Sequence, residues 1–161
     1  MSYRAGIILV QDNKVALIER HRAGLHYFTF PGGHIDEDET PEQAAVRETE
    51  EELGLQVTLK QLLAQLSWQG NWQNYYRVEV TGGTFGSGSG EEMLDPLPER
   101  GTYRPMWMPV AEVLDQPVKP RELAELVVRA VKEGWPEQPV VIPENSVNTH
   151  LTDSSGLYRP R

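Results

Sequence analysis

The chain has 161 residues, a formal net charge of −9 and no cysteine. This length suits one domain with a proper core. The missing thiols exclude a disulfide framework and a thiolate zinc site, and the acidity argues against an extended nucleic-acid surface, whose binding depends on Lys and Arg. The longest early apolar run, Gly6 to Val10, is too short for a signal or membrane-spanning segment. A cytoplasmic protein without a membrane partner is therefore expected, and the four histidines show no zinc-ligand spacing along the chain.

The N-terminal segment reads as β-structure. Aliphatic residues dominate Arg4 to Val10 and Lys14 to His21, and the turn formers Gln11 to Asn13 lie between them. This pattern predicts a hairpin. A third strand is predicted at Leu25 to Phe30, and Pro31 to Gly33 end it.

A helix is predicted next. Thr40 is a hydroxyl N-cap, Pro41 occupies the first helical position, and Gln43 supplies the second arm of a capping box. Gly54 is predicted to end the helix. Apolar or small residues at helical spacing between these limits form a buried stripe.

Two further strands are predicted at Gln56 to Trp68 and Trp72 to Thr81. The segment that follows, Thr81 to Gly90 (TGGTFGSGSG), is glycine-rich. It lacks the Gly-Lys-Ser/Thr ending of a P-loop, so a mobile connection or an active-site lid is favoured over a phosphate cradle. A last strand is predicted around Tyr103 to Val110.

The C-terminal part contains a second predicted helix. It opens at Pro120, has its apolar residues at i, i+3 and i+4 spacing, and stops at Gly134. A short helix is predicted at Val110 to Asp115. From Pro136 onward the prolines and polar residues predict an irregular tail.

Three glutamates on the first predicted helix, Glu48, Glu51 and Glu52, lie three or four residues apart on one face. One interpretation is a solvated charged face. However, like charges at this spacing cost about 0.2–0.5 kcal/mol per pair, and the macrodipole disfavours anions in the last turns. A hard cation turns this geometry into a site, because Mg²⁺ prefers oxygen ligands. A metal site is therefore the favoured interpretation.

The stretch Gly33 to Leu55 (GHIDEDETPEQAAVRETEEELGL) resembles the Nudix box. The departure is Thr49, where the family usually has an aliphatic residue. Thr49 falls on the packing side, and its hydroxyl can bond to a carbonyl one turn earlier. The resemblance implies an α/β Nudix fold, with a mixed sheet between helices, over residues 1–135. Residues 136–161 are expected to be the irregular tail.

Nudix proteins hydrolyse a nucleoside diphosphate linked to another group, with Mg²⁺ or Mn²⁺ neutralising the pyrophosphate while water attacks phosphorus. The resemblance implies these metal ligands: the carboxylates of Glu48, Glu51 and Glu52 and the carbonyl of Gly32. It also implies that Arg47 orients the acids by ion pairing, for which its i, i+4 relation to Glu51 is suitable. Glu39 resembles the outlying glutamate that supports the site.

The sequence leaves two candidate locations for the general base: a glutamate of the box, or a glutamate of the loop that follows the fifth predicted strand. Glu51 is slightly preferred. The alternatives are Glu91, Glu92 and Glu99, for which ordinary loop charge is an equally good interpretation. Glu92 lies beside the glycine run and could swing into a closed site.

The predicted substrate contacts are less specific. Arg20 and Arg22 are candidates to contact phosphate, against the alternative of a solvated strand end. Tyr27 is a candidate to stack on a base, against the alternative of a core residue.

The substrate class stays open among three hypotheses. The first is a pyrophosphohydrolase of nucleoside triphosphates or modified nucleotides. The second is a hydrolase of nucleotide sugars, dinucleotides or capped RNA ends. The third is a non-catalytic nucleotide sensor, which the complete set of box acids disfavours. The expected partner is a small nucleotide, and a homodimer is a candidate assembly.

Overall fold

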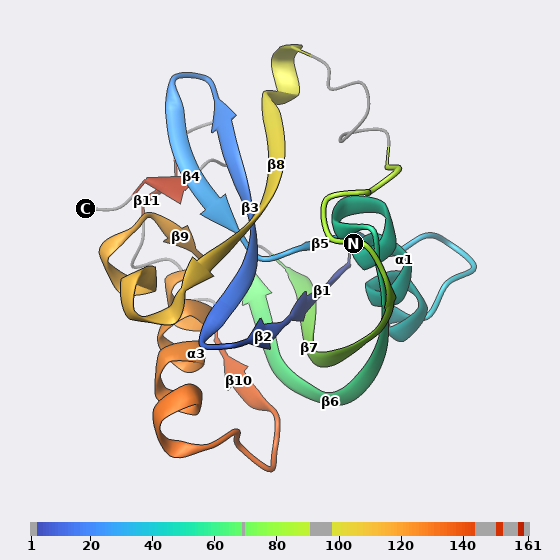
Figure 1. Ribbon diagram of the computed structural model, residues 1–161, viewed down its shortest axis with the longest axis vertical. Helices are drawn as coiled ribbons and strands as arrows, with labels where there is room; N and C mark the ends of the chain where they lie inside the picture. The colour runs from blue at the N-terminus through green and yellow to red at the C-terminus, as the bar shows by residue number, and fades with distance from the viewer. Residues whose placement is uncertain (1–2, 69, 91–97, 144–150, 153–157, 160–161) are drawn as a thin grey trace.

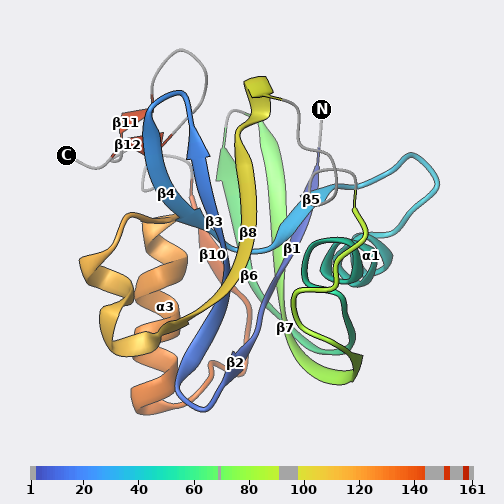
Figure 2. The same cartoon turned by 45° about the horizontal axis from the view of Figure 1, so that its top comes forward.

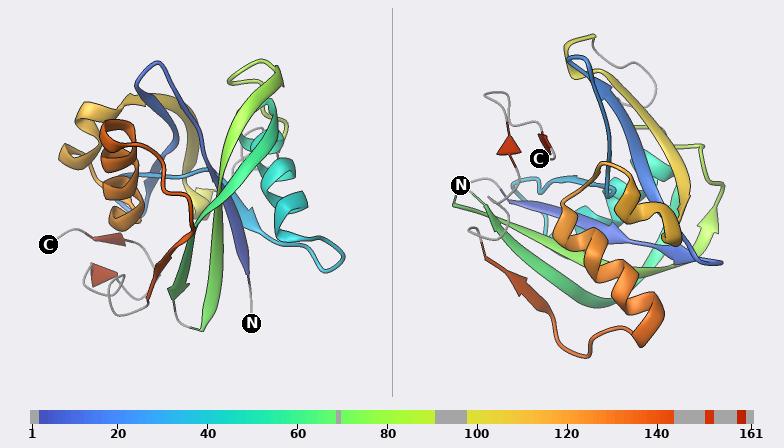
Figure 3. Two further views of the ribbon diagram at one scale, coloured as in Figure 1. Left: turned by 90° about the horizontal axis from the view of Figure 1, so that it is seen from below. Right: turned by 90° about the vertical axis from the view of Figure 1, so that its left-hand side faces the viewer.

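The computed structural model describes residues 3–68, 70–90, 98–143, 151–152 and 158–159. Its strands form two five-stranded sheets and one two-stranded sheet, and Figure 1 shows a helix on either side of the two larger sheets. Figure 3 shows the same layers from below, with α1 and α3 at opposite sides of the strands. The predicted α/β fold with mixed β-structure between helices is confirmed. The difference is that the strands divide into two larger sheets.

The first sheet has the order β10-β6-β7-β1-β5. Its strands are β1 (Arg4–Ile8), β5 (Gly32–His34), β6 (Leu55–Trp68), β7 (Asn71–Gly83) and β10 (Val140–Ile142). The sheet is mixed, because β1 is parallel to β7 and β10 is parallel to β6, while the other pairs are antiparallel. Neither β5 nor β10 was predicted as a strand. Val140–Ile142 therefore corrects the expectation of irregular chain after Pro136.

The second sheet is built around β3. Its strands are β2 (Val10–Gln11), β3 (Lys14–Arg22), β4 (Leu25–Thr29), β8 (Thr102–Pro109) and β9 (Val118–Lys119). Figure 2 shows β8 lying along β3, and the two pair in an antiparallel register over eight positions from Lys14↔Pro109 to His21↔Thr102. The predicted first strand is thus divided, since β1 and β2 belong to different sheets.

The remaining elements are short or helical. They are α1 (Pro41–Leu53), η1 (Pro98–Arg100), η2 (Val110–Asp115), α3 (Arg121–Glu133), and the two-residue strands β11 (Leu151–Thr152) and β12 (Tyr158–Arg159). The predicted short helix is the 3-10 helix η2. No helix in the described part of the chain is long and apolar enough to cross a membrane.

Side chains alternate between two cores. On β1, Ile7 belongs to the cluster that includes α1, whereas its neighbour Ile8 belongs to the cluster that includes α3. On β3, Leu17 and Ile18 divide in the same way. Successive residues of a strand point to opposite faces, so β1 and β3 each supply both cores. This is why these segments read as continuous apolar runs.

The first helix begins and ends as predicted. The Thr40 hydroxyl accepts the Gln43 N–H at 3.1 Å, and the Gln43 side chain accepts the Thr40 N–H at 3.0 Å. Gly54 ends the helix in the left-handed conformation with φ of 76°, which glycine adopts without steric cost. The hydroxyl of Thr49 donates to the Ala45 carbonyl at 2.7 Å, as its position on the packing side predicted.

Candidate active site

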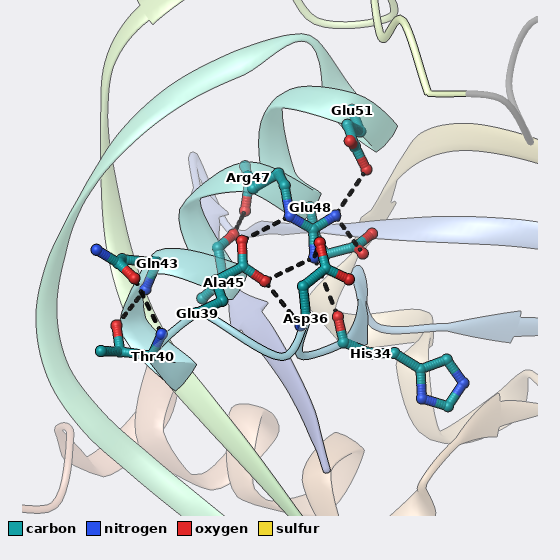
Figure 4. Close-up of polar contacts among 10 residues, drawn as sticks. His34, Asp36, Glu39, Thr40, Gln43, Ala45, Arg47, Glu48 and Glu51 are labelled. Atoms are coloured by element: carbon teal, nitrogen blue, oxygen red, sulfur yellow. Dashed lines mark hydrogen bonds and ion pairs between the residues drawn. The ribbon is translucent and has the colours of Figure 1, made fainter. Parts of the chain in front are cut away.

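Arg47 is the centre of the acidic cluster (Figure 4). Its guanidinium forms a two-pronged pair with Glu39, at 2.7 and 2.9 Å. Nη1 donates to Glu48 at 2.9 Å and to Glu51 at 3.1 Å. Nη2 also donates to the carbonyl of His34 at 3.0 Å. The Arg47 guanidinium therefore connects the carboxylates of Glu39, Glu48 and Glu51 with the end of β5.

The loop before α1 fixes the outlying glutamate. Glu39 accepts the backbone N–H of Asp36 at 3.0 Å, and its side chain is only 14% exposed. The hydrogen bonds from Arg47 hold the pKa of Glu39 below its ordinary value, against the opposing effect of burial. The same pairing raises the pKa of Arg47. The Asp36 carboxylate lies 3.6 Å from Arg47, a contribution that the sequence pattern did not single out.

Glu52 is a buried carboxylate, with 7% of the residue exposed. It accepts the backbone N–H of Gly32 at 2.7 Å. The N–H and C=O of one strand residue point to the same edge, so the Gly32 carbonyl also faces away from β1 towards α1. The Gly32 carbonyl and the Glu52 carboxylate, which the sequence predicted as metal ligands, thus lie on the same side of β5.

Gly33 gives a second close approach between β5 and α1. A Cβ at this position would lie 2.4 Å from the Glu48 Oε1 atom. Only a residue without a side chain lets the Glu48 carboxylate occupy this place. The first glycine of the box therefore has a steric role that a sequence pattern does not display.

The glycine-rich segment 84–90 packs on the C-terminal end of α1. Gly86 and Gly90 donate their N–H groups to the carbonyls of Leu53 and Glu51, each at 2.9 Å. Carbonyls in the last turn of a helix have no partner within it, and these bonds satisfy two of them. They also offset the negative helix end near the acids. These two N–H groups are engaged with the helix, which argues against the phosphate cradle.

Arg20 lies on β3 and turns towards β8. Its Nε donates to the Thr102 carbonyl at 3.0 Å, and Nη2 donates to the Arg100 carbonyl. Its guanidinium carbon is 3.7 Å from the centre of the Tyr103 ring. Within the described residues, its polar contacts lead to this end of β8 and not to Arg47.

The other predicted substrate contacts lie near Arg20. Arg22 donates to the Glu99 carbonyl at 3.3 Å, and Tyr27 is buried with 2% exposed. Their substrate roles stay predictions. Glu99 is exposed, whereas Glu91 and Glu92 lie outside the described residues.

The donor set of α1 and β5 suits a hard divalent cation. Glu48, Glu51 and Glu52 offer carboxylate oxygens within one turn of helix, and Gly32 adds a carbonyl on the same side. Oxygen donors of this kind match Mg²⁺, or Mn²⁺, better than a softer metal. A buried carboxylate such as Glu52 costs free energy unless it is compensated, and a bound cation provides such compensation.

Comparison with known proteins agrees with this geometry. A sequence model described as NUDIX domain matches residues 2–129. An 8-oxo-dGTP diphosphatase from Proteus vulgaris is 43% identical over 63 residues, covering 37% of this chain and 54% of that protein. An RNA pyrophosphohydrolase from Psychromonas ingrahamii is 43% identical over 63 residues, covering 38% and 35%. The chain thus spans about half or less of the length of these relatives.

A solved structure shows the same fold. The crystal structure of an ADP-ribose pyrophosphatase from Streptococcus suis superposes with a TM-score of 0.63 and covers 89% of this chain and 98% of that chain. The two sequences are 17% identical, so the likeness concerns the arrangement of strands and helices alone.

Proposed function

The chain belongs to the Nudix family, and on that premise we propose that it hydrolyses the pyrophosphate linkage of a nucleoside diphosphate derivative in the cytoplasm, with a divalent cation. A nucleoside triphosphate or modified nucleotide is the favoured substrate, because a diphosphatase of 8-oxo-dGTP is among the similar proteins. The observation that carries the proposal is the placement of three glutamates beside β5: Arg47 pairs with Glu48 and Glu51, and Glu52 accepts the Gly32 N–H.

The proposed metal ligands are Glu48, Glu51, Glu52 and the Gly32 carbonyl. When bound, Mg²⁺ neutralises charge on the pyrophosphate and lowers the pKa of the attacking water. Arg47 holds Glu48 and Glu51 at a fixed separation through its shared Nη1 atom. Glu39 in turn orients Arg47.

Glu51 is the preferred general base. Its side chain is 37% exposed, against 12% for Glu48, so water reaches it more readily. We propose that Glu51 accepts a proton from the attacking water as the new P–O bond forms and the bridging P–O bond breaks. Glu91, Glu92 and Glu99 stay the alternatives. Loss of the acidic limb of the kcat profile in a single Gln variant, measured at saturating Mg²⁺, identifies the base. Loss of that limb in a Gln variant of Glu91, Glu92 or Glu99 would contradict the assignment of Glu51.

A second candidate activity is the removal of pyrophosphate from RNA 5′ ends, since an RNA pyrophosphohydrolase is 43% identical over 63 residues. The net charge of −9 weighs against a long RNA partner. We therefore rank this activity below hydrolysis of a free nucleotide.

A panel of substrates tests the proposal. The panel contains canonical and oxidised nucleoside triphosphates, ADP-ribose, nucleotide sugars, dinucleoside polyphosphates and a 5′-triphosphorylated RNA, each with Mg²⁺. Release of phosphate or pyrophosphate separates the classes. Turnover that persists in excess chelator contradicts the metal-dependent mechanism, and binding of nucleotide without turnover favours a sensor.

Mg²⁺ is expected to raise the melting temperature, because it binds the folded protein preferentially. At a concentration of 100 Kd the stabilisation is about 2.7 kcal/mol, which corresponds to a shift of roughly 5–10 °C for a chain of this size. Calorimetric or fluorescence melting measures the shift. The Glu52→Gln variant should show a smaller response, and an equal response in both proteins would place cation binding elsewhere.

Gly33→Ala is expected to lower turnover by about 10²-fold, because the new Cβ displaces the Glu48 carboxylate and small displacements at a reacting centre have effects of this size. The fold should persist, since Glu48 ends a flexible side chain. Gly82→Ala, on β7, is the matched control. Its Cβ would also make a close contact with a side-chain oxygen, 2.8 Å from the Gln56 Oε1 atom, but Gln56 is not a proposed ligand. Steady-state kinetics and circular dichroism compare the two, and equal activities would refute the steric role of Gly33.

A further inference from the structure

We propose that Glu19, His21 and His26 form a second cation site, which takes a transition metal of the Zn²⁺ class. One ligand atom from each side chain lies within 4.8 Å of the others. The three residues belong to the hairpin of β3 and β4, whereas the glutamates of α1 pack against β5. The site therefore uses none of the residues proposed for hydrolysis.

The backbone of the hairpin brings the histidines together. Ala23 and Gly24 have φ of 52° and 77°, the pattern of a two-residue turn that fixes the register. His21 lies directly opposite His26 in that register. Their rings stack with centres 4.2 Å apart and an interplanar angle of 2°. They are five positions apart along the chain, so the sequence spacing alone did not suggest a site.

Glu19 completes the set from the same face of β3, because residues two apart on a strand point the same way. Its Oε2 atom lies 2.8 Å from the His26 Nε2 atom. Zn²⁺ binds nitrogen and oxygen at about 2.0–2.2 Å, which places tetrahedral ligand atoms about 3.3 Å apart. The parallel stack of the two rings has to open before both can bind one ion, because the nitrogen lone pairs lie in the ring planes. The His26 side chain is 48% exposed and has room to rotate.

Arg104 is the competing partner of Glu19. It lies opposite Glu19 on β8, and its Nε donates to the Glu19 Oε1 atom at 2.8 Å. The plain alternative is that these residues form a surface polar network. An exposed ion pair contributes only about 0–1 kcal/mol, however, and the Arg104 side chain is 69% exposed. A metal can therefore compete with Arg104 for the charge of Glu19.

The donor set distinguishes this site from the glutamates of α1. Two imidazoles and one carboxylate suit Zn²⁺, Ni²⁺ or Cu²⁺, whereas carboxylates with a carbonyl suit Mg²⁺. Three protein ligands also leave one tetrahedral position for water or another small ligand. We expect the site to bind Zn²⁺ while excess Mg²⁺ is present.

Titration calorimetry of the full chain with Zn²⁺, in excess Mg²⁺, tests the site. One Zn²⁺ per chain is expected, and His21→Ala and His26→Ala should each weaken its affinity by at least about tenfold. His34→Gln is the matched control, because His34 is a histidine on β5 outside the hairpin. Circular dichroism verifies that each variant folds. Zn²⁺ affinity that is unchanged in His26→Ala, or lost in Glu52→Gln, overturns the proposal.

Arg104→Gln provides a test that does not rely on loss of binding. Removing the competing cation should tighten Zn²⁺ binding, because Glu19 no longer has to exchange a partner. Visible absorption of bound Co²⁺ reports whether the ligand geometry is the same in this variant. Weaker binding in Arg104→Gln would overturn the assignment of Glu19 as a ligand.

Discussion

Replacing Glu52 with glutamine is expected to lower kcat by about 10²–10⁴-fold, the range for removal of a group that acts on the reacting centre. Glutamine keeps the shape of the side chain and an oxygen to accept the Gly32 N–H, so the fold should persist. It removes the negative charge that a cation needs at a residue only 7% exposed. Steady-state kinetics at saturating Mg²⁺ measure the loss.

Glu50→Gln is the matched control for this result. Glu50 belongs to the same helix and is exposed. The same change of charge there should leave kcat within about twofold, as surface substitutions have small effects. If both variants retain activity, Glu52 serves structure. If both variants lose activity equally, kcat depends on the net charge of the helix and not on Glu52 as a specific metal ligand.

Replacing Arg47 with methionine is expected to lower both stability and turnover. Methionine keeps an unbranched apolar stem but removes every hydrogen bond to Glu39, Glu48 and Glu51. The carboxylates then repel one another without the positive charge of Arg47 between them. Hydrogen bonds to charged groups contribute about 1.5–3 kcal/mol each, and partial exposure of Arg47 reduces this, so we expect a loss of about 2–4 kcal/mol in the free energy of unfolding.

The pH dependence of this loss has a definite sign. The folded-state pKa of Glu39 is lowered, chiefly by its hydrogen bond with Arg47. Its stabilisation is therefore present above the ordinary pKa of 4.5 and disappears as pH falls through the lower folded-state value. Urea unfolding should show the largest difference between wild type and Arg47→Met near pH 7, and a smaller difference below pH 4.5. A constant difference, or an equal loss in Arg129→Met on the exposed side of α3, would contradict this origin.

The local features of the site were predictable from the sequence. The capping box of Thr40 and Gln43 and the bond from Thr49 to Ala45 connect residues three or four apart. Such contacts follow from the helical period alone. The common face of Glu48, Glu51 and Glu52 follows for the same reason.

The contacts between distant segments were not predictable. The close contact between Gly33 and the Glu48 carboxylate depends on how β5 packs against α1. The hydrogen bond from Arg20 to the Thr102 carbonyl depends on β8, because Thr102 is 82 positions away in the sequence. The packing of segment 84–90 on the end of α1 is of the same kind. A sequence pattern specifies which groups need partners, but the tertiary arrangement decides which partners they find.

The strand β10 decides where this chain can safely be shortened. The match to the NUDIX domain ends at residue 129, yet Ile142 is buried in the core and the Pro136 carbonyl accepts a hydrogen bond from Gln61 on β6 at 2.7 Å. Removing the chain after Gly134 would leave β6 as the edge of its sheet. Unpaired edges with apolar neighbours recruit strands from other molecules. A chain trimmed after Gly134 should therefore precipitate or form strand-paired aggregates, whereas one that retains Pro143 should not.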